Sequence, residues 1–349
     1  MAASSPFGVG TLLAVLAAVA FAATTPIVQE ADRGVGAFAT AALLYGGAAT
    51  AALALGGFKF APVARVSRKH SLRLLTVASF GATLAPTLFA WGLQHSGATT
   101  AALLLNMEAV FTVVLAWLVL REPMGRRLAL AALLLTCGGL LLSLQHGIRV
   151  EGQVWGVLAV AGATFCWSVD NTFSRPLSEE APLPIVAAKC GAGALLSVLM
   201  ASALGNALPS VSAAITLLGC GALSYGVSLG LYLGAQRRIG AARTGSTFAI
   251  APFIGAASAW LWGDRELGST VAVAVPLFVL GIYLHATERH RHRHTHEAMD
   301  HSHLHRHDDG HHEHSHDPPV VGEHEHWHHH PALEHDHEHA PDIHHRHSH

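Results

Sequence analysis

The C-terminal part of the chain holds its densest set of side chains that can bind metal. Of the 28 histidines in the sequence, 25 lie between His285 and His349, and most alternate with one other residue. Imidazole nitrogen is a good ligand for zinc, nickel, copper and cobalt, and tracts this rich in histidine are typical of metal binders. The pattern predicts a tail that binds divalent Ni, Co, Zn or Cu, with a passive low-complexity tail as the alternative. The candidate ligands are His290, His292, His294, His296, His301, His303, His305, His307, His312, His314, His316, His324, His326, His328, His335, His337, His339, His345, His347 and His349.

The same segment has the composition of a polar tail that lacks a core of its own. Residues 288–349 contain five arginines and thirteen acidic residues, a net charge of −8 with neutral histidine. No apolar periodicity is visible, and prolines at positions 318, 319, 331 and 341 disfavour helix. The segment is therefore predicted to be disordered when it holds no metal.

Three charged side chains interrupt apolar stretches upstream of the tail, where a charge in a membrane costs roughly 2.5–3.5 kcal/mol. Glu108 lies ten residues into the apolar run 98–120, near the middle of a bilayer if that run crosses it. It is interpreted as a proton-carrying carboxylate or a cation ligand, with a helix-packing acid as the alternative. Asp170, beside Asn171, is placed to approach Lys189, either as a structural ion pair or as a clamp on a substrate.

Polar residues also form stripes at helical spacing on two further apolar stretches. Such stripes line a water-filled path or make hydrogen bonds between helices, and the sequence leaves both interpretations open. Pro252 is the best candidate for a discontinuous helix at a binding site. The stripes consist of Tyr225, Ser228 and Tyr232 on one stretch, and of Thr87, Trp91 and Gln94 on the other.

These residues belong to a chain that is 51% hydrophobic and only 13% charged, which excludes an ordinary soluble domain. About 20 consecutive apolar residues cross a hydrocarbon core of about 30 Å. Helices are expected because open strands cannot satisfy their backbone groups in lipid. Ten membrane-spanning helices are predicted, near residues 8–27, 35–57, 74–94, 98–120, 127–145, 153–173, 183–204, 213–234, 244–262 and 269–286.

The two halves of this apolar region repeat each other. Gly97, Trp117, Gly125 and Gly138 recur 143 residues later as glycine, tryptophan, glycine and glycine. Five spans in each half place the second copy upside down relative to the first. Inverted repeats of this kind are typical of secondary transporters, whose substrate site lies where the repeats meet. The predicted domains are a first repeat at 1–147, a second repeat at 148–287 and the tail at 288–349.

Loop charges predict the orientation in the membrane. With the N-terminus in the cytoplasm, the cytoplasmic loops and the start of the tail hold fifteen Lys or Arg, against three in the opposite loops. This positive-inside bias predicts an inner-membrane protein with both termini in the cytoplasm.

The stretch from Ala101 to Leu141 resembles the EamA family of the drug/metabolite transporter superfamily. The likeness covers about residues 8–286 and implies a ten-helix transporter, often a proton-coupled exporter of small metabolites. Ala109 stands where the first copy usually has proline, so a helix break is expected only at Pro252. The matching residues are Glu108, Trp117, Glu122, Gly125, Gly138 and Gly139 in the first copy, and Pro252, Trp260, Glu266, Gly268 and Gly281 in the second.

The prediction is an all-α membrane protein, not an enzyme, that exports a divalent transition-metal ion or a metal-binding metabolite. An exporter of an organic metabolite, with a tail that only stores metal, is the alternative. A membrane-anchored metal sensor is a rival from another class. No cofactor is required. The expected partners are the bilayer, the substrate and a second copy of the chain in a homodimer, and nucleic acid is not among them.

Overall fold

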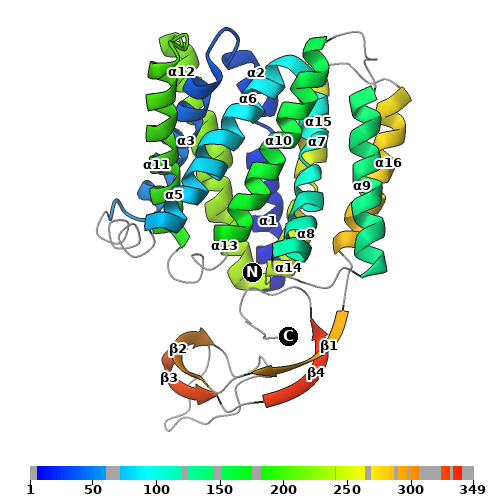
Figure 1. Cartoon of the computed structure of the whole chain (residues 1–349). Helices are drawn as coiled ribbons and strands as arrows, with labels where there is room; N and C mark the ends of the chain where they lie inside the picture. Colours follow the sequence, from blue (N-terminus) through cyan, green and yellow to red (C-terminus); the bar gives the residue numbers. More distant parts are fainter. Residues whose placement is uncertain are drawn as a thin grey trace, which may run out of the picture. The chain divides into compact units, whose positions relative to one another are not determined.

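A computed structural model describes residues 6–59, 71–119, 125–144, 151–174, 182–239, 241–263 and 269–286, and the tail segments 290–296, 299–305, 324–330 and 333–339. The chain divides into two compact units, Met1–Glu288 and Arg289–His349. In the described part of the first unit the regular structure is helical, and the helices form a bundle (Figure 1). The two predicted repeats therefore share one unit.

In the described part of the first unit, apolar runs form helices, and the described residues of each predicted span are largely helical. The helices are α1 (Pro6–Ala22), α2 (Thr25–Ala31), α3 (Ala37–Leu55), α5 (Ser71–Ser79), the π-helix η1 (Phe80–Leu84), α6 (Ala85–Ser96), α7 (Ala98–Leu104), α8 (Met107–Val119), α9 (Arg126–Leu144), α10 (Glu151–Ser174), α11 (Pro182–Ala203), α12 (Val211–Gly221), the π-helix η3 (Ala222–Val227), α13 (Ser228–Ile239), α14 (Ala241–Phe248), α15 (Ala251–Trp262) and α16 (Ser269–Ala286).

Six helices of the described part are long and apolar enough to cross a membrane, and Ser269–His285 is a shorter apolar helix. The protein is thus a multi-pass membrane protein by its own helices, while the count of ten spans stays a prediction. The six are Gly8–Ala31, Ala37–Leu55, Ser71–Ser96, Ala98–Leu115, Leu183–Ala203 and Val211–Ala235.

Corresponding elements recur in the two repeats and run in opposite directions (Figure 1). The succession α5–η1–α6 recurs as α12–η3–α13, and adding 143 to the bounds of α6 gives those of α13. Each succession contains a π-helix at the same place. A π-turn inside an α-helix often marks a functional site. The repeat therefore extends to irregular backbone as well as to apolar composition.

Both repeats also contain a helix that breaks and restarts. In the second repeat, α15 begins with Pro252 in its first turn, as predicted. In the first repeat, α7 ends and α8 restarts at Met107, so the expectation of a break only at Pro252 is wrong. Asn106 takes the place of proline there: its Nδ2 donates to the carbonyl of Leu103 at 2.8 Å. The neighbouring amides of Glu108 and Ala109 donate three residues back, at 3.1 and 3.2 Å.

Small residues let the helices of the two repeats approach closely. A Cβ on Gly47 of α3 would meet the Leu218 carbonyl of α12, and one on Gly221 would meet the Leu44 carbonyl of α3. Close backbone contact at small residues is the usual packing mode of helices in membranes. It brings α3 of the first repeat against α12 and η3 of the second.

The tail differs from the prediction of disorder in the parts that the structure describes. β1 (His290–His296) pairs with β4 (Leu333–His339), and β2 (Met299–His305) pairs with β3 (His324–His330), both antiparallel. The alternation of histidine with other residues has the two-residue period of a strand, which is why extended structure suits this sequence. Two-stranded sheets are at best marginally stable by themselves in water. His307, His312, His314, His316, His345, His347 and His349 lie outside the described residues.

Candidate functional site

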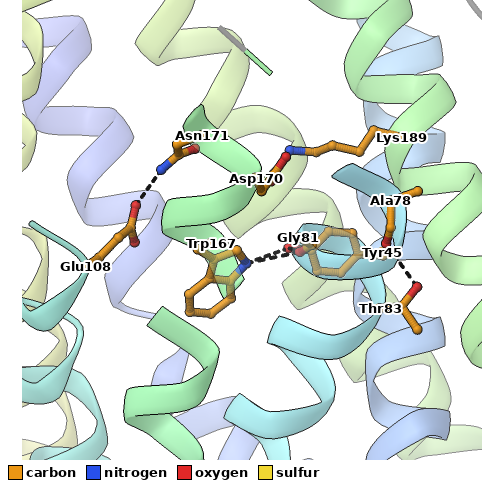
Figure 2. A network of polar contacts seen from close by, with 9 residues as sticks. All are labelled: Tyr45, Ala78, Gly81, Thr83, Glu108, Trp167, Asp170, Asn171 and Lys189. Carbon is orange, nitrogen blue, oxygen red and sulfur yellow. Dashed lines mark hydrogen bonds and ion pairs between the residues drawn. The ribbon is translucent and has the colours of Figure 1, made fainter. Parts of the chain in front are cut away.

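The centre of the first unit holds a network of polar side chains contributed by both repeats (Figure 2). Glu108, in the first turn of α8, accepts a hydrogen bond from Asn171 Nδ2 of α10 at 2.7 Å. The carboxylate is partly exposed. It lies in the first turn of α8, where the helix dipole favours a negative charge. This explains how the first repeat accommodates an acid at this depth.

The break between α7 and α8 is tied directly to α10. Ser168 Oγ lies 2.9 Å from the carbonyl of Glu108 and 2.9 Å from the carbonyl of Thr164. Thr112, one turn beyond Glu108, donates to Ser168 Oγ at 3.2 Å. The restarted helix is therefore anchored on the same face of α10 that presents Asn171. A shift of α10 against α8 would change both Glu108 contacts together.

Asp170, the residue before Asn171, forms an ion pair with Lys189 of α11. Nζ lies 2.6 Å from Asp170 Oδ2, and the two side chains are 4% and 18% exposed, with Asp170 the more buried. The predicted approach of these residues is thus found. The Asp170 carboxylate packs directly against Gly81 of η1. A Cβ at that position would collide with the carboxylate.

The carbonyl of Gly81 is the centre of a second cluster. Tyr45 Oη of α3 donates to it at 2.8 Å, and Trp167 Nε1 of α10 lies 3.1 Å from this carbonyl and 3.1 Å from Tyr45 Oη. The register of a π-helix differs from that of an α-helix, and side chains can insert where carbonyls are freed. η1 therefore joins α3 and α10 through one backbone atom.

Tyr225 adds a second aromatic residue of the second repeat, besides Trp167, to the same cluster. It belongs to η3, and its ring centroid lies 5.1 Å from that of Tyr45 and 6.5 Å from that of Trp167. Phe21 of α1 meets Tyr225 edge-on at 5.6 Å. The two π-helices thus contribute a carbonyl and an aromatic ring to one region, as expected for a site where repeats meet.

The remaining predicted residues lie apart from this network or are not described. Trp91 stacks on His95 at 4.0 Å and is 36% exposed, near the end of α6. Pro252 lies in the first turn of α15. Glu122 and Glu266 of the motif lie outside the described residues. Within the described side chains, no group of three or more His, Cys, Asp or Glu is placed to hold a metal.

Sequence reasoning missed Tyr45, Gly81, Asn106 and Ser168. Tyr45 and Gly81 sit in runs of small apolar residues with no polar periodicity, so nothing in the local pattern marks them. Asn106 precedes Glu108 by two residues in the quoted motif and could have been read as a helix breaker, since asparagine competes for backbone hydrogen bonds. Ser168 lies two residues before the predicted Asp170, and its spacing alone does not reveal its partners.

A bundle of apolar helices built from two oppositely directed halves, with charged groups at the centre, defines a transporter of the inverted-repeat class. The chain belongs to the EamA-like transporter family, which matches residues 8–144 and 154–287. These two matches cover one repeat each. The family assignment, with the apolar helices, describes a multi-pass membrane protein of a transporter family.

Two individual proteins are similar to the chain. An "Uncharacterized transporter" from Methanothermobacter thermautotrophicus is 30% identical over 227 residues, which cover 63% of this chain and 66% of that protein. The chain thus matches slightly less than two thirds of that relative. One crystal structure has a TM-score of 0.59 at 20% identity, covering 79% of this chain and 95% of the other, and it supports the fold alone.

Proposed function

We propose that the protein is a proton-coupled secondary transporter of the inner membrane in which Glu108 binds a proton and the substrate in turn. The observation that carries this is the position of Glu108, whose carboxylate starts α8 beside Asn171 with no described ion pair. Asp170, by contrast, has Lys189 as its counter-ion. A charged residue inside a membrane bundle is a functional candidate by default, because it is costly to keep there. Efflux, with both termini in the cytoplasm, is part of the proposal.

The chemistry around Glu108 favours a small organic substrate that carries an ammonium group. A carboxylate and the oxygen of a neighbouring carboxamide can both accept hydrogen bonds from an ammonium group, and aromatic faces attract cations. Trp167 lies one turn before Asn171 on α10, and its ring is grouped with those of Tyr225 and Tyr45. When the proton occupies the carboxylate, the ammonium loses its counter-charge. Competition between the two cations for one group is the simplest basis for coupled exchange.

A divalent metal ion or a metal-binding metabolite is the second candidate, and the tail is the observation that favours it. In the paired strands, His290, His292 and His294 stand opposite His339, His337 and His335, and β2 and β3 repeat the arrangement with three further histidine pairs. Residues directly opposite in antiparallel strands lie about 5 Å apart, a spacing that suits chelation of one ion by two imidazoles. In this case the tail captures or buffers the metal.

Ligand-dependent thermal stability of the purified protein separates the two candidates. The probes are choline and putrescine as organic cations, NiCl2 and ZnCl2 as metals, and sodium acetate as an anion control. A ligand that binds only the folded state stabilises it by about 2.7 kcal/mol at a hundredfold excess over Kd. We expect choline or putrescine to raise the Tm, and Glu108→Gln to abolish that rise while Glu30→Gln leaves it unchanged.

Truncation after Arg289 gives the second arm of the experiment. If the organic candidate is right, the truncated chain keeps its response to choline or putrescine and loses only nickel and zinc binding. A metal response that survives truncation and disappears with Glu108→Gln would instead support the metal as substrate. A full-length protein whose Tm responds to no cation of the panel would contradict the proposed site.

A further inference from the structure

A second buried carboxylate lies at the end of the bundle where α2 terminates, away from the start of α1 (Figure 1). Asp32 follows α2 directly, is 0% exposed, and has no hydrogen-bond partner for either carboxylate oxygen in the described structure. A buried charge without a partner is among the most costly features a protein can contain. It lies outside the predicted spans and takes no part in the network of Glu108.

The elements around Asp32 offer few charges. α12, α15 and α7 pack against α2 and contain no Asp, Glu, Lys, Arg or His, the only ionisable group among them being the buried thiol of Cys220. α6 contributes His95, α3 carries only Tyr45, and the segment 204–210 carries no ionisable side chain. On its own segment Arg33 is the nearest cation, but it binds Glu30 at 2.8 Å, and these side chains are 70% and 55% exposed.

The backbone of Asp32, unlike its carboxylate, is firmly held. Its amide donates to Val28 at 2.9 Å, and its carbonyl accepts from the amide of Val35 at 2.9 Å and from Gln94 Nε2 of α6 at 3.0 Å. Gln29 Nε2 of α2 donates a hydrogen bond to the carbonyl of Leu93 in α6 at 3.3 Å. These bonds close the loop 32–36 over the end of α6, and they bury the carboxylate as long as they persist.

A polar pocket adjoins this closure. It has a volume of about 410 Å³ and is lined by Gln29, Arg33, Gly34, Gln94 and His95. Two of its lining residues, Gln29 and Gln94, are those that tie α2 to α6. Because the lining residue Gln94 also binds the Asp32 carbonyl, opening that contact would give water from the pocket a route to Asp32.

We propose that Asp32 is a proton-binding site that closes this end of the bundle: the packed loop holds the protonated acid, and loss of the proton favours opening toward the polar pocket. The inference rests on the proposed transporter function, which needs ends that open and close in turn. It assigns a second protonation site, distinct from Glu108, to the closing of one end.

The electrostatics of the site agree with this assignment. Burial raises the pKa of the Asp32 carboxyl from 3.8 to about 7, and the nearby Gln94 amide and the Arg33 charge offset only part of the effect. In an open state that admits water, the ordinary value near 3.8 applies. The packed state holds the proton more tightly than the open state does. Proton binding at Asp32 therefore stabilises the packed state fully below about pH 3.8, and this stabilisation is lost as the pH rises through about 7.

Amide hydrogen exchange of the full-length protein in lipid nanodiscs tests the site without any substrate. The measured quantity is the opening equilibrium of residues 29–36, compared at each pH between wild type and Asp32→Asn. The opening equilibrium constant of the wild type is divided by that of Asp32→Asn at each pH. With pKa values of 3.8 in the open state and about 7 in the packed state, this ratio should rise roughly eightyfold between pH 5 and pH 8 and then level off. Glu30→Gln and His95→Gln, which remove the other titratable groups nearby, should follow the wild type.

A pH-independent ratio would overturn the proposal, as would Asp32→Asn following the wild-type profile or His95→Gln abolishing it. If Asp32→Asn fails to insert into the membrane, the wild type and Glu30→Gln still test the proposal. In both, the opening equilibrium of residues 29–36 must rise with pH once the intrinsic exchange rates are divided out. Failure of the proposed function would appear separately, as loss of the cation-dependent rise in Tm with the exchange profile of residues 29–36 intact.

Discussion

At the scale of single residues, Asp170 and Lys189 show why a charge inside the bundle does not by itself identify a coupling group. Their atoms lie 2.6 Å apart and both side chains are largely buried, so each compensates the other. Burying two charges is expensive, and breaking such a pair on one side costs more than removing it altogether. Glu108 has an amide rather than a cation as its partner, and this difference supports its assignment to proton and substrate binding.

We expect Lys189→Met to lower the free energy of unfolding by roughly 3–5 kcal/mol, because it leaves Asp170 buried and unpaired. Asp170→Asn combined with Lys189→Met should recover most of that loss. The matched control is Glu30→Gln at the exposed pair with Arg33, which should cost about 0–1 kcal/mol. Thermal unfolding in detergent measures all three. A double variant that is no more stable than Lys189→Met would argue against a structural pair and in favour of a substrate clamp.

At the scale of elements, the two π-helices are the feature that most directly positions the site. η1 supplies the Gly81 carbonyl and the glycine surface beside Asp170, and η3 supplies Tyr225. Their equivalent positions in the two repeats mean that the centre of the bundle is built from two copies of one backbone irregularity. The side chains on them differ between copies, since Ser224 stands where the first repeat has Gly81.

Gly81→Ala should therefore disturb the site although it adds a single methyl group. The new Cβ would collide with the Asp170 carboxylate, and overpacking of this kind typically costs about 1–3 kcal/mol. Gly219→Ala in α12 is the control, because nothing lies within 4 Å of its Cβ position, and it should be neutral or stabilising by up to about 1 kcal/mol. Equal thermal stability of the two variants would contradict the described packing of Asp170 on η1.

Most of the elements could be predicted from the sequence, because apolar runs and the repeat of glycines and tryptophans are local signals. The second repeat's helix break was predictable from Pro252. The break before Glu108 was not predicted, because the proline expected there is missing and the side-chain hydrogen bond of Asn106 was overlooked. The π-helices have no signature in the amino-acid composition. Trp91 was predicted as a site residue because it shares a helical face with Gln94, but it stacks on His95 and lies apart from the network of Glu108. The pairing of Asp170 with Lys189 was predictable because both lie near the same end of consecutive spans.

At the scale of the whole molecule, the chain combines a transporter unit with a separate histidine-rich unit. The family matches cover residues 8–144 and 154–287, so the tail lies beyond both repeats. Transport is therefore expected to depend on the helical unit, with the tail adding metal capture. The inner-membrane location and cytoplasmic termini follow from loop charges alone and remain predictions.

The central claim, that Glu108 exchanges a proton for the substrate, is tested most directly by flux in proteoliposomes under an imposed pH gradient. The labelled compound is choline or putrescine, whichever stabilises the purified protein. We predict that wild type and Glu30→Gln accumulate it against its gradient in proportion to the pH difference, and that Glu108→Gln accumulates none while keeping its fold. Accumulation by Glu108→Gln with the wild-type dependence on pH would contradict the account.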